Sequence, residues 1–132
     1  ESGDVGDVKI KVYKTQDEVI SEHALDPTSV LLSSSLWEGV DLKDDLSRFQ
    51  IIAKVPYPNY TEKRTKAKMS KFPSWYTSKT LTKILQGFGR SIRSDDDWAK
   101  TYVLDTAVNN VFFKGRQMIP KAYYDVLGLD EI

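Results

Sequence analysis

Three polar side chains in the second half of the chain have a spacing that suits phosphate chemistry. The segment Gln86–Arg93 reads QGFGRSIR, so Gln86, Arg90 and Arg93 are four and then three residues apart. On a helix, this spacing places all three side chains on one face. Two guanidinium groups on one face bind phosphate oxygens bidentately. The alternative is a pair of surface arginines bridged to the acidic run 95–97.

Two glycines, Gly87 and Gly89, interrupt this predicted helix. Each glycine costs a helix roughly 1 kcal/mol relative to alanine. Such a cost usually has a reason, for example close packing against a neighbouring strand or a ligand. The glycines therefore favour the phosphate-binding interpretation over that of surface arginines.

A second polar segment, Ser33–Leu42 (SSSLWEGVDL), follows a short apolar run. Gly39 allows the backbone to turn sharply or to approach a ligand closely. Glu38 and Asp41 supply two carboxylates beside it. The alternative is a capped loop, in which serine and aspartate side chains satisfy the N-terminus of a helix.

The charge of the chain is uneven, although its formal net charge is zero. Residues 61–93 hold nine basic side chains and one acidic side chain, with Phe72, Trp75 and Tyr76 among them. Lysines on phosphates and aromatic rings on bases are the components of single-strand binding. We predict contacts with DNA through six residues: Lys63, Arg64, Lys66, Lys68, Trp75 and Tyr76. The alternative is that the aromatic rings belong to the core and the lysines face water.

Length and composition limit what can position these residues. A chain of 132 residues with 40% hydrophobic and 29% charged residues is long enough for one globular domain. No apolar run approaches the roughly 20 residues of a membrane span. The chain has no cysteine and one histidine, His23, so we expect no metal site, no disulfide and no cluster ligated by this chain. We expect His23 to be partly exposed, and Trp37 and Trp98 to be packing residues.

Short apolar runs between helical stretches predict an α/β sheet with buried parallel strands. The expected strands are residues 8–12, 30–32, 49–55 and 100–104. The expected helices are residues 16–24, 61–71, Ser74–Arg93 and 109–127, the last interrupted by Gly115 and Pro120. Ligands of such sheets bind beyond the carboxyl ends of the strands, where the polar segments fall.

These segments and their order along the chain resemble the motifs of a known protein family. SSSLWEGVDL resembles helicase motif V, and QGFGRSIR resembles motif VI of superfamily 2 helicases. FQIIAKVPYP lies between them and SDDDWAKTYVLD follows, an order similar to that of the XPD/DinG-type DNA helicases. The resemblance covers about residues 28–106. It implies a RecA-like α/β domain of the phosphate-loop NTPase type, with a mostly parallel sheet flanked by helices. This would be the second, C-terminal motor domain, at residues 8–132 after a flexible end at 1–7.

The resemblance also implies roles for the polar residues. Arg93 matches the arginine finger that reaches the γ-phosphate of ATP, and Arg90 matches a second phosphate contact. Gln86 matches a residue that orders the nucleotide cleft, and Gly89 is the glycine of the same motif. Gly39 and Asp41 match the motif V loop, which couples the nucleotide site to the nucleic-acid strand, and Glu38 is the usual neighbour there.

Two expected motifs are absent from the sequence. There is no G-x-x-x-x-G-K-[ST] phosphate loop and no D-E-A-H-type magnesium motif. Both belong to the first motor domain of the family, which in many relatives also carries an iron–sulfur cluster. We therefore expect a fragment of a longer intracellular helicase, in the cytoplasm of a prokaryote or the nucleus of a eukaryote. The first domain would bind most of the ATP and Mg²⁺, and this fragment alone would be inactive.

The expected partners are ATP, single-stranded DNA and the first RecA-like domain of the same protein, and no membrane. Relatives fused to a nuclease stay open as parents of this chain. The alternative function is a nucleic-acid- or protein-binding module that keeps the motor fold without acting as a motor. A phosphate loop and a D-E-A-H-type box upstream in the parent gene would favour the motor.

Overall fold

The computed structural model describes residues 15–34, 42, 44–88 and 98–128. The chain divides into two compact units, residues 1–33 and 34–132. Several predicted features lie outside the described residues: the strand at 8–12, most of the motif V segment, the end of the helix that carries motif VI, and Trp37.

The first unit contains the helix α1 (Gln16–Leu25), which confirms the helix predicted at 16–24. A capping box begins it, because Thr15 Oγ1 accepts the N–H of Glu18 and a Glu18 carboxylate oxygen accepts the N–H of Thr15, both at 3.3 Å. His23 is partly exposed, as predicted, and its Nδ1 lies 2.6 Å from Ser29 Oγ.

The strand predicted at 30–32 is wrong. Val30 and Leu32 are about four-fifths exposed, and the segment has no strand conformation. An extended segment becomes a strand only by pairing with another, and no strand of the described chain pairs with this one. The apolar run therefore marks neither a strand nor a buried segment.

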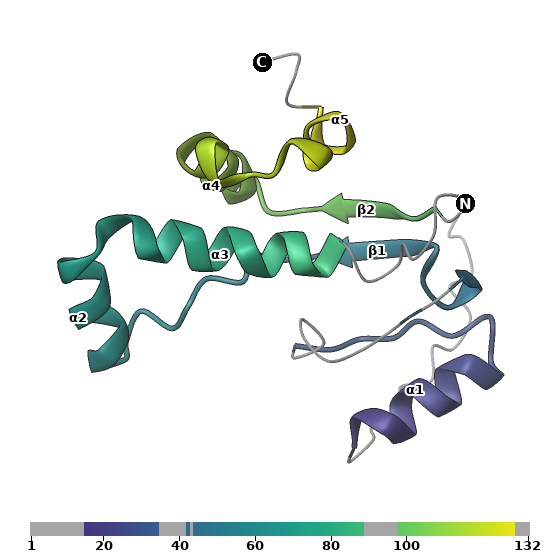
Figure 1. Ribbon diagram of the computed structural model, residues 1–132. Helices are drawn as coiled ribbons and strands as arrows, with labels where there is room; N and C mark the ends of the chain where they lie inside the picture. Colours follow the sequence, from purple (N-terminus) through teal and green to yellow (C-terminus); the bar gives the residue numbers. More distant parts are fainter. Residues whose placement is uncertain (1–14, 35–41, 43, 89–97, 129–132) are drawn as a thin grey trace, which may run out of the picture. The chain divides into compact units, whose positions relative to one another are not determined.

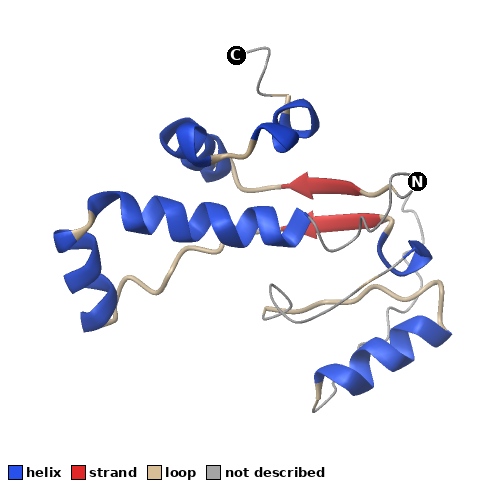
Figure 2. Ribbon diagram, in the orientation of Figure 1, coloured by secondary structure: helices blue, strands red, loops and turns tan. Residues whose placement is uncertain are grey.

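The second unit contains a parallel pair of strands, β1 (Phe49–Ile52) and β2 (Lys100–Val103). Their arrows lie side by side and point the same way (Figure 2). The register pairs Phe49 with Lys100 and Ile52 with Val103. The strands predicted at 49–55 and 100–104 are confirmed in position, although β1 is shorter. The prediction that they are buried is wrong, because Phe49, Ile51 and Tyr102 are at least half exposed. A 3-10 helix, η1 (Asp44–Ser47), comes before β1.

The helices α2 (Lys63–Lys71) and α3 (Pro73–Phe88) lie between the strands in sequence (Figure 1). Pro73 occupies the first position of α3, where its missing N–H leaves no hydrogen bond unmade. Thr80, Leu81 and Ile84 form the buried stripe of α3, and Gly87 is also buried. This stripe confirms the predicted amphipathic helix as far as Phe88.

After β2 the chain forms α4 (Ala107–Gly115), then the 3-10 helices η2 (Arg116–Met118) and η3 (Lys121–Tyr123), and then α5 (Tyr124–Leu127). The predicted interruptions at Gly115 and Pro120 are confirmed. A Cβ atom at Gly115 would lie 3.0 Å from Leu81 Cδ2. The glycine therefore lets the end of α4 pack closely against α3.

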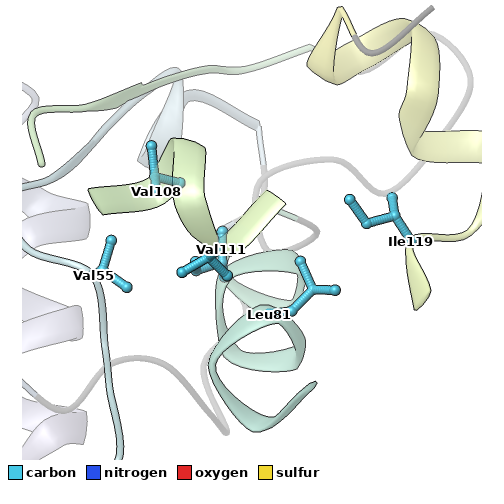
Figure 3. Close-up of a cluster of buried hydrophobic side chains, with 6 residues drawn as sticks. Val55, Leu81, Val108, Val111 and Ile119 are labelled. Atoms are coloured by element: carbon cyan, nitrogen blue, oxygen red, sulfur yellow. The ribbon is translucent and has the colours of Figure 1, made fainter. Parts of the chain in front are cut away.

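The hydrophobic core joins the turn after β1 to these helices. Its members are at most 8% exposed: Val55, Leu81, Ile84, Val108, Val111 and Ile119. Five of them are labelled in Figure 3. The core thus fixes the position of α3 and of the turn after β1.

Candidate nucleic-acid interface

The basic segment, residues 61–93, contains the two packed helices α2 and α3. We call this pair of helices, with the residues that join them, the elbow. Figure 1 shows α2 turning sharply away from the line of α3, with Phe72 between them. The N–H of Phe72 donates to the Lys68 carbonyl at 2.7 Å, and the N–H of Trp75 donates to the Phe72 carbonyl at 3.0 Å. These bonds hold the elbow and bring the lysines of α2 beside the aromatic residues that follow.

Three lysines of α2 lie over aromatic rings. The Nζ atom of Lys68 is 4.9 Å from the ring centroid of Trp75. Lys66 lies 5.2 Å from the ring of Tyr60, and Lys71 lies 5.8 Å from the ring of Phe72. At these distances the positive charge is attracted by the face of the ring. The elbow therefore presents a surface of alternating positive charge and aromatic rings.

The aromatic residues of this elbow are not core residues. Tyr60 and Phe72 are 59% and 55% exposed, and Trp75 and Tyr76 are half-buried. None of the four belongs to the buried hydrophobic cluster. The alternative is therefore wrong in placing Phe72, Trp75 and Tyr76 in the core. Its other part, lysines that face water, agrees with the exposure of Lys63 and Lys66.

The six predicted DNA contacts all lie on this elbow. Lys63, Arg64 and Lys66 are exposed on α2, and Lys68 is half-buried because it covers Trp75. The structure thus brings Lys68 and Trp75 together, while Tyr76 contacts a residue outside the predicted set. Their contact with DNA stays a prediction.

Sequence reasoning missed Tyr57. Its ring stacks on that of Tyr76 with centroids 5.5 Å apart and planes 8° from parallel. The Tyr76 hydroxyl donates to the Pro58 carbonyl at 3.1 Å. Burial raises the pKa of Tyr76, and the nearby Tyr57 and Tyr60 raise it further, so the hydroxyl remains a donor. Two aromatic residues in the Pro-Tyr-Pro-Asn-Tyr run, just before the basic segment, were the available signal.

The predicted phosphate site lies mostly outside the described residues. This holds for Arg90, Arg93, Gly89, Glu38, Gly39 and Asp41. Gln86 is described, and its side chain is exposed near the end of α3 while the neighbouring Gly87 is buried. The exposed side chain of Gln86 is accessible to a ligand, and its role there stays a prediction.

Trp98 is half-exposed at 51% and lies outside the core cluster. It packs edge-on against Phe49, with ring centroids 6.3 Å apart, and lies under the guanidinium of Arg48. This confirms Trp98 as a packing residue, although at the surface.

The described part of the chain contains no cluster of three or more histidine, aspartate or glutamate side chains arranged to hold a metal ion. None of its helices combines the length and the apolar character that crossing a membrane requires.

The parallel pair of strands and the helices between and after them form an α/β unit. The chain belongs to the family of helicase C-terminal domains, which it matches over residues 7–123. This confirms the helicase resemblance and the RecA-like α/β class of the fold.

Two curated relatives are similar to the chain. The probable ATP-dependent helicase YpvA of Bacillus subtilis (strain 168) is 34% identical over 79 residues, which are 57% of this chain and 12% of YpvA. The ATP-dependent DNA helicase chl1 of Schizosaccharomyces pombe (strain 972 / ATCC 24843) is 24% identical over 124 residues, which are 83% of this chain and 15% of chl1. The chain thus spans less than a sixth of either relative. No solved structure matches the chain significantly.

Proposed function

We propose that this chain is the second motor domain of an XPD/DinG-type ATP-dependent DNA helicase. The observation that carries the proposal is the family match over residues 7–123, which includes the motif V and motif VI segments. The two relatives named above are both described as ATP-dependent helicases, and chl1 as a DNA helicase. The rest of the motor, including the first motor domain with its phosphate loop, would belong to a longer protein.

In this proposal the chain completes an ATP site at the interface between the two motor domains. The first domain would bind most of the ATP and the Mg²⁺. Arg93 would place positive charge on the γ-phosphate as the phosphoryl group transfers, and Arg90 would add a second phosphate contact. Gln86 would order the nucleotide cleft from the end of α3, and Gly89 would leave room for the phosphates.

The same domain would couple ATP hydrolysis to movement on single-stranded DNA. Glu38, Gly39 and Asp41 would couple the nucleotide site to the strand. The elbow of α2 and α3 would hold the strand, with its lysines on phosphates and its aromatic rings on bases. The exposed lysines and aromatic rings of the elbow support this part of the proposal.

The test uses the full-length protein and the variants Arg93→Ala and Arg93→Lys. We expect DNA-stimulated ATP turnover to fall by roughly 10³ or more in Arg93→Ala, while ATP still binds. Arg93→Lys should also be impaired, because an ammonium group lacks the planar fork of guanidinium. Unchanged turnover in Arg93→Ala would instead favour a binding module with a helicase-like fold.

A further inference from the structure

We propose that the exposed face of Tyr57 is a stacking site for one nucleobase of single-stranded DNA. The inference rests on the proposed function, because it extends the DNA-binding surface of the elbow. It adds a residue of a different element, the turn after β1, to the residues of α2 and α3.

The geometry leaves one face of Tyr57 available. The other face lies against Tyr76, with the two rings nearly parallel. Tyr57 is still 40% exposed, and a stacked neighbour covers only one face of a ring, so we infer that the opposite face is open to a ligand. A base placed there would extend the stack of two rings to three, in the offset geometry that aromatic groups prefer.

Tyr57 also differs from three nearby aromatic residues. Lysines cover a ring face of Tyr60, Phe72 and Trp75. In the described part of the chain, no cation lies over the ring of Tyr57. A base can therefore stack on Tyr57 without displacing a lysine.

The backbone around Tyr57 is fixed before any ligand binds. Pro56 and Pro58 flank it, and a following proline restricts the preceding residue to extended conformations. The N–H of Tyr57 donates to the Val55 carbonyl at 2.9 Å, and Val55 belongs to the core. A ring that is already ordered loses little entropy on binding, so more of the stacking energy appears as affinity.

The charges nearby suit a nucleic-acid strand. Tyr60 follows Tyr57 by three residues in the same turn. The Lys66 ammonium group lies 5.2 Å from the ring centroid of Tyr60. A base stacked on Tyr57 would have phosphates within reach of the α2 lysines. Stacking accepts any base, so the site would be tolerant of sequence.

The experiment compares two ligands that carry the same phosphates. One is an oligothymidine of about 20 nucleotides, longer than a typical single-strand site, and the other is its fully abasic analogue. In the full-length protein, we expect Tyr57→Leu to weaken binding of oligothymidine by roughly 5-fold to 150-fold. The variant should bind the abasic strand as the wild type does. The slope of log affinity against log salt should not change, because no phosphate contact is lost.

Two control variants separate stacking from a structural role. Tyr57→Phe keeps the ring and should bind oligothymidine like the wild type. Tyr102→Leu removes another tyrosine ring that is 50% exposed, on β2, and should leave both affinities unchanged. The inference is overturned if Tyr57→Leu binds oligothymidine normally. It is equally overturned if the variant loses both ligands to the same extent, since the tyrosine would then only support the turn.

A failure of this inference is distinguishable from a failure of the proposed function. The double variant Lys66→Glu/Lys68→Glu tests the elbow through its charges, and it should weaken binding of both ligands. If it does so while Tyr57→Leu binds normally, the elbow binds DNA without Tyr57 and the stacking site is wrong. If neither variant changes binding, both the stacking site and the DNA-binding elbow are wrong.

Discussion

The carboxylate of Asp105 accepts a hydrogen bond from the backbone N–H of Val55, with a distance of 3.0 Å from nitrogen to Oδ2. Its other oxygen accepts the N–H of Ala107, also at 3.0 Å. One side chain therefore ties the turn after β1 to the start of α4. The bond from Val55 lowers the pKa of Asp105, and the bond from Ala107 and the charge of Lys54 lower it further, while desolvation opposes the shift.

This carboxylate makes the free energy of unfolding of the domain depend on pH. Because the pKa of Asp105 is lower in the folded state than in the unfolded state, its contribution is fully present above the unfolded pKa. The contribution is lost as the pH falls through the folded pKa. We expect the wild-type domain to lose stability below about pH 4, and Asp105→Asn to be less stable at neutral pH.

The measurement is urea unfolding of the purified chain at several pH values. Asp125→Asn is the matched control, since Asp125 is exposed. If Asp105→Asn and the wild type lose the same stability between neutral pH and about pH 3, Asp105 is not the group responsible.

A second prediction concerns Ile84, whose side chain is fully buried in α3 at 0% exposure. Replacing it by alanine removes apolar contacts and leaves a cavity among Val55, Leu81 and Val111 in the core. We expect Ile84→Ala to lower the free energy of unfolding by about 2–5 kcal/mol, and Ile84→Val by about 0.5–1.5 kcal/mol. Urea unfolding measures both values.

The control is Leu104→Ala, since Leu104 is 67% exposed and should contribute within about 0.5 kcal/mol. Equal losses in Ile84→Ala and Leu104→Ala would contradict the core described above.

The third prediction concerns the charges of the elbow. Each phosphate contact on a single strand contributes about 0.7 to the slope of log affinity against log salt. Lys66→Glu/Lys68→Glu should therefore lower the magnitude of this slope by about 1.4 and weaken binding of single-stranded DNA. Fluorescence anisotropy with the full-length protein at several salt concentrations measures both quantities.

Lys114→Glu/Lys121→Glu is the control for this measurement. It changes net charge by the same amount, and both lysines are exposed outside the basic segment. A similar slope change in both double variants would mean that total charge, rather than the elbow, sets the affinity.

Local patterns in the sequence predicted most of the helices and strands. The period of α3, the proline at its start and the interruptions at Gly115 and Pro120 act within a few residues of each other, so they can be read without a structure. The run Val30–Leu32 misled because a short apolar run has the same pattern whether it is paired or exposed. Pairing depends on a distant partner, which the run itself does not encode.

In the candidate site too, the sequence predicted contacts within one segment but not contacts between distant segments. Lys68 and Trp75 were predicted from one continuous basic segment, and the structure places them in contact. The Tyr57–Tyr76 stack was not predicted. Tyr57 lies in the turn after β1 and Tyr76 lies in α3, and the whole of α2 separates them in the sequence. The aromatic residues of the Pro-Tyr-Pro-Asn-Tyr run were a signal for Tyr57 itself, but they do not indicate its partner in α3.

The pairing of β1 with β2 has a consequence for synthesis on the ribosome. Phe49 pairs with Lys100, so β1 has no partner until the chain has grown past β2. At about 5–20 residues per second, the newly made strand waits for several seconds without the backbone hydrogen bonds that β2 supplies. Such long-range pairing also slows folding, because a large loop must close first. During this interval the nascent chain would be most dependent on chaperones.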